Sequence, residues 1–455
     1  MDTKSASRIN QGVALHQQGR LDDAERIYRD VLARWPRSAD ALHLLGIIAK
    51  QKRQYLQAIS LIEQAISISP DAANIADYHS NCGEAYRAVF DYEKALICYE
   101  RACRVVAAPR PAVLFNIAGC MQELGRYRES IVYFDQVLAM QPGYARAHFR
   151  RAYAHLPIEQ YEAGWRDYEW HIEAATGERY LRDPRDPQSL LPRPSDLLPI
   201  DWQDKRVLLC QDQGLGDELC ILRFLPRLAA QGARVVYQPP EKLRPLLRRS
   251  GCCELHTPDD MDFDHVFSSS ELPLLTGMSR TDQIPLPVAL TPRADLLKRY
   301  RQMLDELPKP WVGITWRAGT PEIQQGQFKE VPVRLLAQAL RQQPGTIIVL
   351  QRNLDDRDLT RFSDRQILNL SRESESLEDA LALMSLLDRY IAVSNTNVHL
   401  RSSLGLPSEV LTTTAPIDYR WPRHLKNSPW LPGCRSLKQG LDGTWDDAMR
   451  ALAPN

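Results

Sequence analysis

A periodic repeat in the first third of the chain constrains the fold more than any other feature. Small residues recur at spacings of 34, 37, 35 and 34, and a second series twelve positions later keeps the same spacings. The first series is Gly12, Gly46, Gly83, Ala118 and Ala152, and the second is Ala24, Ala58, Ala95, Ser130 and Gly164. Two antiparallel helices approach closely only where one side chain is small, so the two series predict a row of helical hairpins.

Prolines and aromatic residues mark the same period. A proline closes successive units, and a tyrosine precedes the second small residue by three positions; these residues are Pro36, Pro70, Pro109 and Pro142, and Tyr55, Tyr92, Tyr127 and Tyr161. Proline ends a helix, and hairpins that bury their apolar faces against neighbours stack into a solenoid. The pattern resembles the tetratricopeptide repeat, with a solenoid expected over residues 1–172. That resemblance implies a surface for a protein or peptide partner, although such arrays also serve as scaffolds.

The repeat stops near His171, and five prolines follow before Trp202. This composition favours an extended connection over residues 173–204. Beyond it, short apolar runs alternate with helical patterns. Strands are expected at 206–210, 234–238, 311–316, 346–350 and 390–393, and helices at 218–230, 332–342 and 377–387. Such alternation predicts parallel sheets with helices on both faces, in two Rossmann-like lobes at 205–295 and 296–455.

Ligands of open parallel sheets bind at the carboxyl ends of the strands, so the loops there are the candidate sites. The first loop holds Gly214, Gly216 and Asp217 before a helix. Two glycines allow a tight turn and a close ligand, and the helix start offers unpaired N–H groups. Asp217 could equally be an N-cap residue.

Two further loops carry polar residues after a predicted strand. Arg317 and Lys329 flank one loop. Two cations in these positions suit a diphosphate clamp, and the alternative interpretation is two solvated surface charges. The other loop runs from Ser394 through Thr396 to His399, where small polar residues suit either helix capping or phosphate binding. His399 lies inside the predicted helix, where a packed, hydrogen-bonded histidine is the simpler interpretation.

As a set, these segments resemble known enzymes. The order GLGD, then a tryptophan loop with a basic residue before proline, then S-x-T-x-x-H-L-x-x-x-L-G is similar to GT-B glycosyltransferases related to bacterial heptosyltransferases. The later segments Asp418–Trp421 and Ser428–Pro432 are similar to members that carry amino-terminal tetratricopeptide repeats. Relatives of that kind include bacterial protein O-glycosyltransferases, among them enzymes that act on flagellins. The expected fold is therefore an α-solenoid followed by a two-lobed α/β domain of GT-B type.

The resemblance also implies roles for individual residues. Asp217 becomes the candidate general base for an acceptor hydroxyl, on a loop shaped by Gly214 and Gly216. Donor contacts are implied for the residues of the second lobe, with Arg317 and Lys329 on the phosphates and Thr396 in a cradle for the leaving group; the others are Gln351, Asn395, Asn397 and His399. Base and fixed cations suit transfer from a nucleotide-sugar without a metal or other cofactor.

One departure from the family pattern leaves alternatives open. Heptosyltransferase-like sequences commonly have Asp before the threonine, whereas this chain has Asn395. The leading hypothesis is transfer to a protein acceptor recruited by the repeats, with flagellin as one candidate acceptor. The alternatives are heptosyltransferase-like transfer to a saccharide or lipid-linked acceptor, and a non-catalytic scaffold with a degenerate transferase domain.

Composition excludes several other classes. The 57 basic and 57 acidic residues balance, so nucleic acid is not expected as a partner. No run approaches the roughly 20 apolar residues of a membrane span, which predicts a soluble, cytoplasmic protein. The nine cysteines lack the spacing of a zinc site. Residues 205–250 hold an excess of basic residues, which suits an anionic nucleotide or saccharide.

Overall fold

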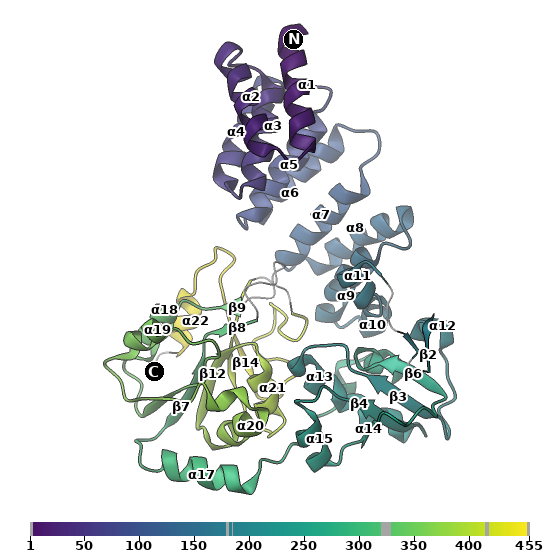
Figure 1. Ribbon diagram of the computed structural model, residues 1–455, viewed down its shortest axis with the longest axis vertical. Coiled ribbons are helices and arrows are strands. Elements are labelled where there is room, and N and C mark those ends of the chain that lie inside the picture. Colours follow the sequence, from purple (N-terminus) through teal and green to yellow (C-terminus); the bar gives the residue numbers. More distant parts are fainter. Residues whose placement is uncertain (1–2, 179–181, 184, 320–328, 415–417, 453–455) are drawn as a thin grey trace. The chain divides into compact units, whose positions relative to one another are not determined.

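The computed structural model describes residues 3–178, 182–183, 185–319, 329–414 and 418–452. The chain forms two compact units, residues 1–154 and 155–455 (Figure 1). None of the helices in the described residues is long and apolar enough to cross a membrane.

The first unit consists of paired helices, as the repeat predicts. They are α1 Thr3–Gln17, α2 Leu21–Arg34, α3 Ala39–Gln51, α4 Tyr55–Ile68, α5 Ile75–Ala88, α6 Tyr92–Arg104, α7 Pro111–Glu123 and α8 Tyr127–Met140, followed by α9 Ala145–His155 at the end of the unit. Each odd-numbered helix packs against the next even-numbered one, and each pair packs against its successor. This is a tetratricopeptide-repeat solenoid.

The small residues lie where the helices of a pair touch. A Cβ added at Gly46 would lie 2.6 Å from Cγ1 of Ile62, and one at Gly83 would lie 2.8 Å from Cε1 of Tyr99. Ala24, Ala58 and Ala95 on the partner helices are fully buried. The tyrosines at 55, 92 and 127 each begin the second helix of a pair, and Tyr161 begins α10. Pro36, Pro70 and Pro142 follow two residues after a helix end, whereas Pro109 lies two residues before α7. The predicted reason for the repeat is therefore confirmed.

The second unit opens with short elements, which begin within the range predicted for the solenoid and continue through the predicted connection of 173–204. These are the 3-10 turn η1 Leu156–Ile158, α10 Tyr161–Tyr168, α11 His171–Thr176, the antiparallel strands β1 Arg182–Asp183 and β2 Asp186–Leu190, and α12 Pro194–Leu197. Side chains fold this proline-rich stretch locally. The Arg193 guanidinium lies 3.5 Å from the ring centre of Trp170, and Ser195 donates to Glu169 at 2.6 Å.

A four-stranded parallel sheet follows in the described residues, with order β5-β4-β3-β6. Its strands are β3 Arg206–Cys210, β4 Arg234–Gln238, β5 Glu254–Leu255 and β6 His265–Ser268; its helices are α13 Leu215–Ile221, α14 Leu225–Ala230, α15 Arg244–Ser250 and α16 Leu272–Leu275, with 3-10 turns η2 Leu222–Phe224, η3 Ser269–Glu271 and η4 Thr281–Gln283. The helix predicted at 218–230 begins earlier and is interrupted, because Pro226 in the first turn of α14 has no N–H to donate.

The second sheet is also parallel, with six strands in the described residues and the order β11-β10-β7-β12-β13-β14. The strands are β7 Trp311–Thr315, β10 Thr346–Val349, β11 Ile367–Asn369, β12 Arg389–Val393, β13 Glu409–Thr412 and β14 Arg435–Lys438, and a separate antiparallel pair is β8 Arg317–Ala318 and β9 Lys329–Glu330. The helices are α17 Ala294–Leu304, α18 Val333–Leu340, α19 Asp356–Leu359, α20 Leu377–Leu386, α21 Thr396–Ser402 and α22 Asp446–Leu452, with 3-10 turns η5 Thr360–Phe362 and η6 Glu373–Glu375.

Alternate residues of the second sheet face two different layers. Val312 and Ile314 of β7 join α18 and α22 in one apolar core. Between them, Gly313 faces the other way and lies under Leu387 at the end of α20. The region after the repeats thus has parallel sheets and helices, and its strand ends position the polar loops described next.

Candidate functional site

Asp217 lies in the first turn of α13, directly after strand β3. The N-cap position of this helix belongs to Gly214, so capping does not explain Asp217. Its carboxylate instead accepts a hydrogen bond from Nη1 of Arg420, which follows β13 of the other sheet. Asp217 keeps 40% of its side chain exposed. The loop after β3 and the loop after β13 therefore meet at a carboxylate that solvent can still reach.

The glycines of this loop do not serve the tight turn that the sequence suggested. Gly214 has φ −68°, and Gly216 is not among the residues with positive φ. A Cβ added at Gly216 would lie 2.9 Å from Cδ2 of His399 and 3.4 Å from Cα of Thr396. Gly216 is needed for the close packing of α13 on α21, which brings the two loops together.

Arg420 is held on its other side by Asp418. Nε and Nη2 of Arg420 donate to the two oxygens of Asp418 at 2.7 and 2.8 Å. Nζ of Lys329 lies 3.8 Å from the same carboxylate. Burial would raise the pKa of Asp418, but the charges of Arg420 and Lys329 hold it below its usual range. Burial lowers the pKa of Lys329, which Asp418 partly offsets.

His399 lies beneath this charged cluster and is 4% exposed. Burial, with the nearby charges of Arg420 and Arg223, lowers its pKa well below the ordinary value, so the imidazole is neutral. Its Nδ1 has no hydrogen-bond partner within the described parts of the chain. The expected packing is present, but the expected hydrogen bond at this nitrogen is not.

Two of the residues predicted to contact the nucleotide-sugar use their polar atoms for hydrogen bonds within the protein. Asn395 is the N-cap of α21: its Oδ1 accepts from the Val398 N–H at 3.1 Å, and its Nδ2 donates to Tyr390 at 3.2 Å. Gln351 accepts from the N–H groups of Trp316 and Arg317 at 3.0 and 2.9 Å, and it donates to two carbonyls. Both side chains fix the backbone of a loop.

The remaining predicted residues divide between two places. Thr396 begins α21 beside Gly216, and Asn397 is buried in the same turn near Tyr390. Arg317 does not join Lys329 at the charged cluster. Its guanidinium lies 3.1 Å from Asp358 and 3.6 Å from Glu330, and it donates to the Asn353 carbonyl. Pairing of β8 with β9 sets Ala318, and not Arg317, opposite Lys329.

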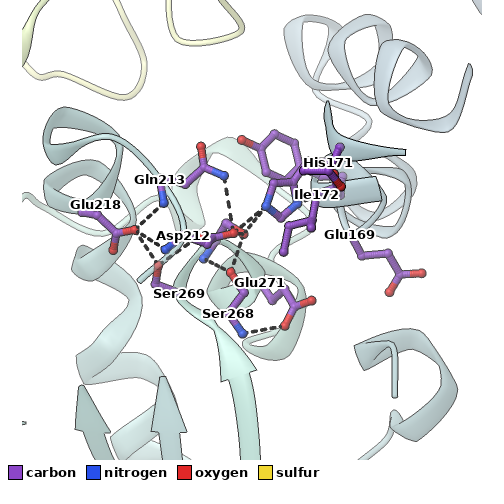
Figure 2. A network of polar contacts seen from close by, with 12 residues as sticks. Glu169, His171, Ile172, Asp212, Gln213, Glu218, Ser268, Ser269 and Glu271 are labelled. Carbon is purple, nitrogen blue, oxygen red and sulfur yellow. Dashed lines mark hydrogen bonds and ion pairs between the residues drawn. The ribbon is translucent and has the colours of Figure 1, made fainter. Parts of the chain in front are cut away.

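A buried network that the sequence did not reveal holds the loop after β3 (Figure 2). Oε1 of Glu218 accepts the N–H groups of Asp212 and Gln213 at 3.0 and 2.9 Å, and Oε2 accepts from Tyr237 at 2.5 Å. Ser269 donates to Glu218 at 2.9 Å. Burial, with the charge of Asp212 added, raises the pKa of Glu218 to about 7.

His171 closes the other side of this network. Its Nε2 lies 2.5 Å from Asp212, and its Nδ1 lies 3.0 Å from the Tyr168 carbonyl (Figure 2). Ser270 lies 3.4 Å from the same Nε2 and donates to Asp212 at 2.9 Å. A hydrolase triad instead needs the serine and the carboxylate on opposite ring nitrogens. The arrangement supports the loop and does not form a hydrolase triad. The sequence signal for this network is a pair of acidic residues, Asp212 and Glu218, close together after β3.

Comparison with known proteins identifies the repeats. Tetratricopeptide-repeat family models match residues 6–37, 37–108 and 122–163. Protein FlbA of Caulobacter vibrioides (strain ATCC 19089 / CIP 103742 / CB 15) is 23% identical over 99% of this chain and 90% of its own length. A DnaJ homolog subfamily C member 7 homolog of Schizosaccharomyces pombe (strain 972 / ATCC 24843) is 25% identical over 36% of this chain and 37% of its own.

Two solved structures are similar to part of the chain. The crystal structure of MamA is 17% identical, covers 36% of this chain and 95% of its own, and has a TM-score of 0.33. YrrB, described as a tetratricopeptide-repeat protein with an unusual peptide-binding site, is 21% identical, with coverage of 37% and 84% and a TM-score of 0.34. The family models identify tetratricopeptide repeats in the first part of the chain and support a role in protein interaction.

Proposed function

We propose that this chain is a glycosyltransferase of GT-B type, which moves a sugar from a nucleotide-sugar to a hydroxyl group of a protein acceptor bound by the repeats. One observation carries the proposal. The loops at the carboxyl ends of two separate parallel sheets meet, and they do so through Asp217 on one side and Arg420, Asp418 and Lys329 on the other. Ligands of such sheets bind at these strand ends.

The charges of the cluster suit the chemistry of sugar transfer. Attack on an anomeric carbon needs a base for the acceptor hydroxyl and positive charge at the departing phosphate. Asp217 is the exposed carboxylate in the position for the first role. Lys329 and Arg420 are the cations for the second, and the neutral His399 adds no charge beneath them. Thr396 and Asn397 line the same edge, whereas Gln351 and Asn395 act by fixing loops.

The test is a transfer assay with the full-length protein. The protein is mixed with a panel of nucleotide-sugars and with extract proteins, and incorporated sugar is measured by mass spectrometry. We expect one donor to label a protein, and Lys329→Met to raise the KM for that donor because a phosphate ligand is lost. If no donor is either transferred or hydrolysed, the chain is not a glycosyltransferase.

A second function, a non-catalytic binding scaffold, is favoured by a different observation. The charged side chains of the cluster all pair with one another, and Asn395 serves as a helix cap. A degenerate domain would keep such pairs for stability alone. Calorimetry with the same nucleotide-sugars separates the two: saturable binding supports the transferase, and its absence at millimolar concentration supports the scaffold.

A further inference from the structure

Arg420 is an almost buried cation that pairs with two carboxylates, one buried and one partly exposed. Its side chain is 10% exposed. Two of its nitrogens are committed to Asp418, which is 12% exposed, while Nη1 alone contacts Asp217, which is 40% exposed. Asp217 can therefore return to water at a lower cost than Asp418. The Asp418 contact fixes the guanidinium, and the Asp217 contact is the exchangeable one.

The surroundings of Nη1 suit an anion with several oxygens. Lys329 shares Asp418 with Arg420, so two cations face one buried carboxylate. The buried His399 lies within reach of the charges of Arg420, Asp418 and Lys329, and its Nδ1 lacks a hydrogen-bond partner among the described residues. A planar guanidinium next to an ammonium group is the arrangement that proteins use for phosphates.

We propose that the Asp217–Arg420 ion pair stands in for a diphosphate group: the diphosphate of a nucleotide-sugar takes the Nη1 face of Arg420 and releases Asp217. This inference rests on the proposed function, because it concerns the donor of that reaction. Asp217 is occupied by Arg420 until the donor arrives, and it is then free to accept a proton from the acceptor hydroxyl. The donor therefore binds before the acceptor, and Arg420 is a donor ligand that also controls the base.

The test measures affinity for inorganic pyrophosphate by calorimetry, with the full-length protein in neutral buffer. Asp217→Asn removes the competing carboxylate and should bind pyrophosphate about three- to tenfold more tightly than the wild type. Asp282→Asn is the matched control, because Asp282 is an exposed carboxylate of the same unit paired with a different arginine, Arg280. Its affinity should equal that of the wild type.

A second pair of variants separates exchange at Arg420 from a general change in charge. Arg420→Lys keeps the positive charge but loses the Nη1 contact. In that background the additional change Asp217→Asn should leave pyrophosphate affinity unaltered. Equal or weaker binding by Asp217→Asn alone, or no binding of pyrophosphate by any of the proteins, overturns the inference.

These outcomes are independent of sugar transfer. Tighter pyrophosphate binding by Asp217→Asn, together with no transfer by the wild type, would keep the exchange and remove the proposed function. Sugar transfer by the wild type, together with unchanged pyrophosphate affinity in Asp217→Asn, would keep the proposed function and remove the exchange.

Discussion

Glu218 is next to the proposed base in sequence but has a different task. Its carboxyl group is buried and accepts the N–H groups of Asp212 and Gln213, so it fixes the loop from which Asp217 projects. Its position in the first turn of α13 would by itself be favourable for a carboxylate. Burial and the neighbouring Asp212 nevertheless raise its pKa to about 7. Ionisation of this group therefore opposes folding.

The stability of the protein should carry the signature of this residue. Above pH 4.5, the ordinary pKa, the unfolded chain releases the Glu218 proton, whereas the folded chain keeps it until about pH 7. The free energy of unfolding therefore falls as pH rises through this window, by about 3 kcal/mol, and then levels off. Glu218→Gln, measured beside the wild type by urea unfolding at several pH values, should lack this component. A constant difference between the two proteins would contradict the assignment.

Asn395 gives a second prediction at this scale. Because its side chain caps α21, Asn395→Ala should lower the free energy of unfolding by about 1 kcal/mol. Asn395→Asp keeps the accepting oxygen and should retain most of the stability. Urea unfolding at neutral pH measures both. A loss in Asn395→Asp as large as that in Asn395→Ala would show that capping is not what holds this residue.

At the scale of elements, the repeat rests on close contact between paired helices. Gly83→Ala would drive a methyl group into the buried ring of Tyr99 and should lower the free energy of unfolding by about 1–3 kcal/mol. Gly119 provides the control, since it is also helical but its added Cβ would meet only Arg150, at 3.6 Å. Gly119→Ala should stabilise by up to about 1 kcal/mol. Thermal unfolding followed by circular dichroism distinguishes them, and equal effects would contradict the packing account.

The sequence predicted these elements unevenly, for physical reasons. Helical hairpins and the strands β3 and β4 depend on local periodicity and continuous apolar runs, and β3 and β4 have the bounds expected. Strands β5, β6, β11, β13 and β14 were not expected, because they are two to four residues long and the edge strand β14 is mostly polar. So short a segment carries too little pattern to separate it from a loop.

The candidate site shows the same limit. The rule for parallel sheets placed Asp217, Lys329 and His399 near strand ends, and the structure brings these three together. The pairing of Asp217 with Arg420 joins loops 203 residues apart, and no periodic signal marks such a contact. Arg317 was grouped with Lys329 because both are cations beside one loop, yet Asp358 and Glu330 hold it elsewhere.

At the scale of the whole molecule, several basic residues of the first sheet region are held by partners within the protein. The excess of basic residues in 205–250 is dispersed: Arg206 pairs with Asp260, Arg249 pairs with Glu378, and Arg223 donates to backbone carbonyls. Lys329 and Arg420 are the cations that the proposed function assigns to the phosphates of the donor. In the proposed function, the repeats recognise the protein acceptor and the second unit carries out sugar transfer.

Removal of the repeats tests this division. A protein that lacks residues 1–144 keeps α9 whole, and it should lose most transfer to a protein acceptor while it still hydrolyses the nucleotide-sugar. Retained hydrolysis shows that the second unit has folded. Full transfer to the protein acceptor without the repeats would point to a saccharide or lipid-linked acceptor site on the second unit.

The most direct measurement of the central claim is the initial rate of sugar transfer by Asp217→Asn with the donor that the panel identifies. The asparagine keeps the shape of the side chain but cannot take a proton from the acceptor. We predict that kcat falls by about 10²- to 10⁴-fold, while the exposed control Asp282→Asn matches the wild type. A rate for Asp217→Asn equal to that of the wild type would contradict a site in which this carboxylate is the base.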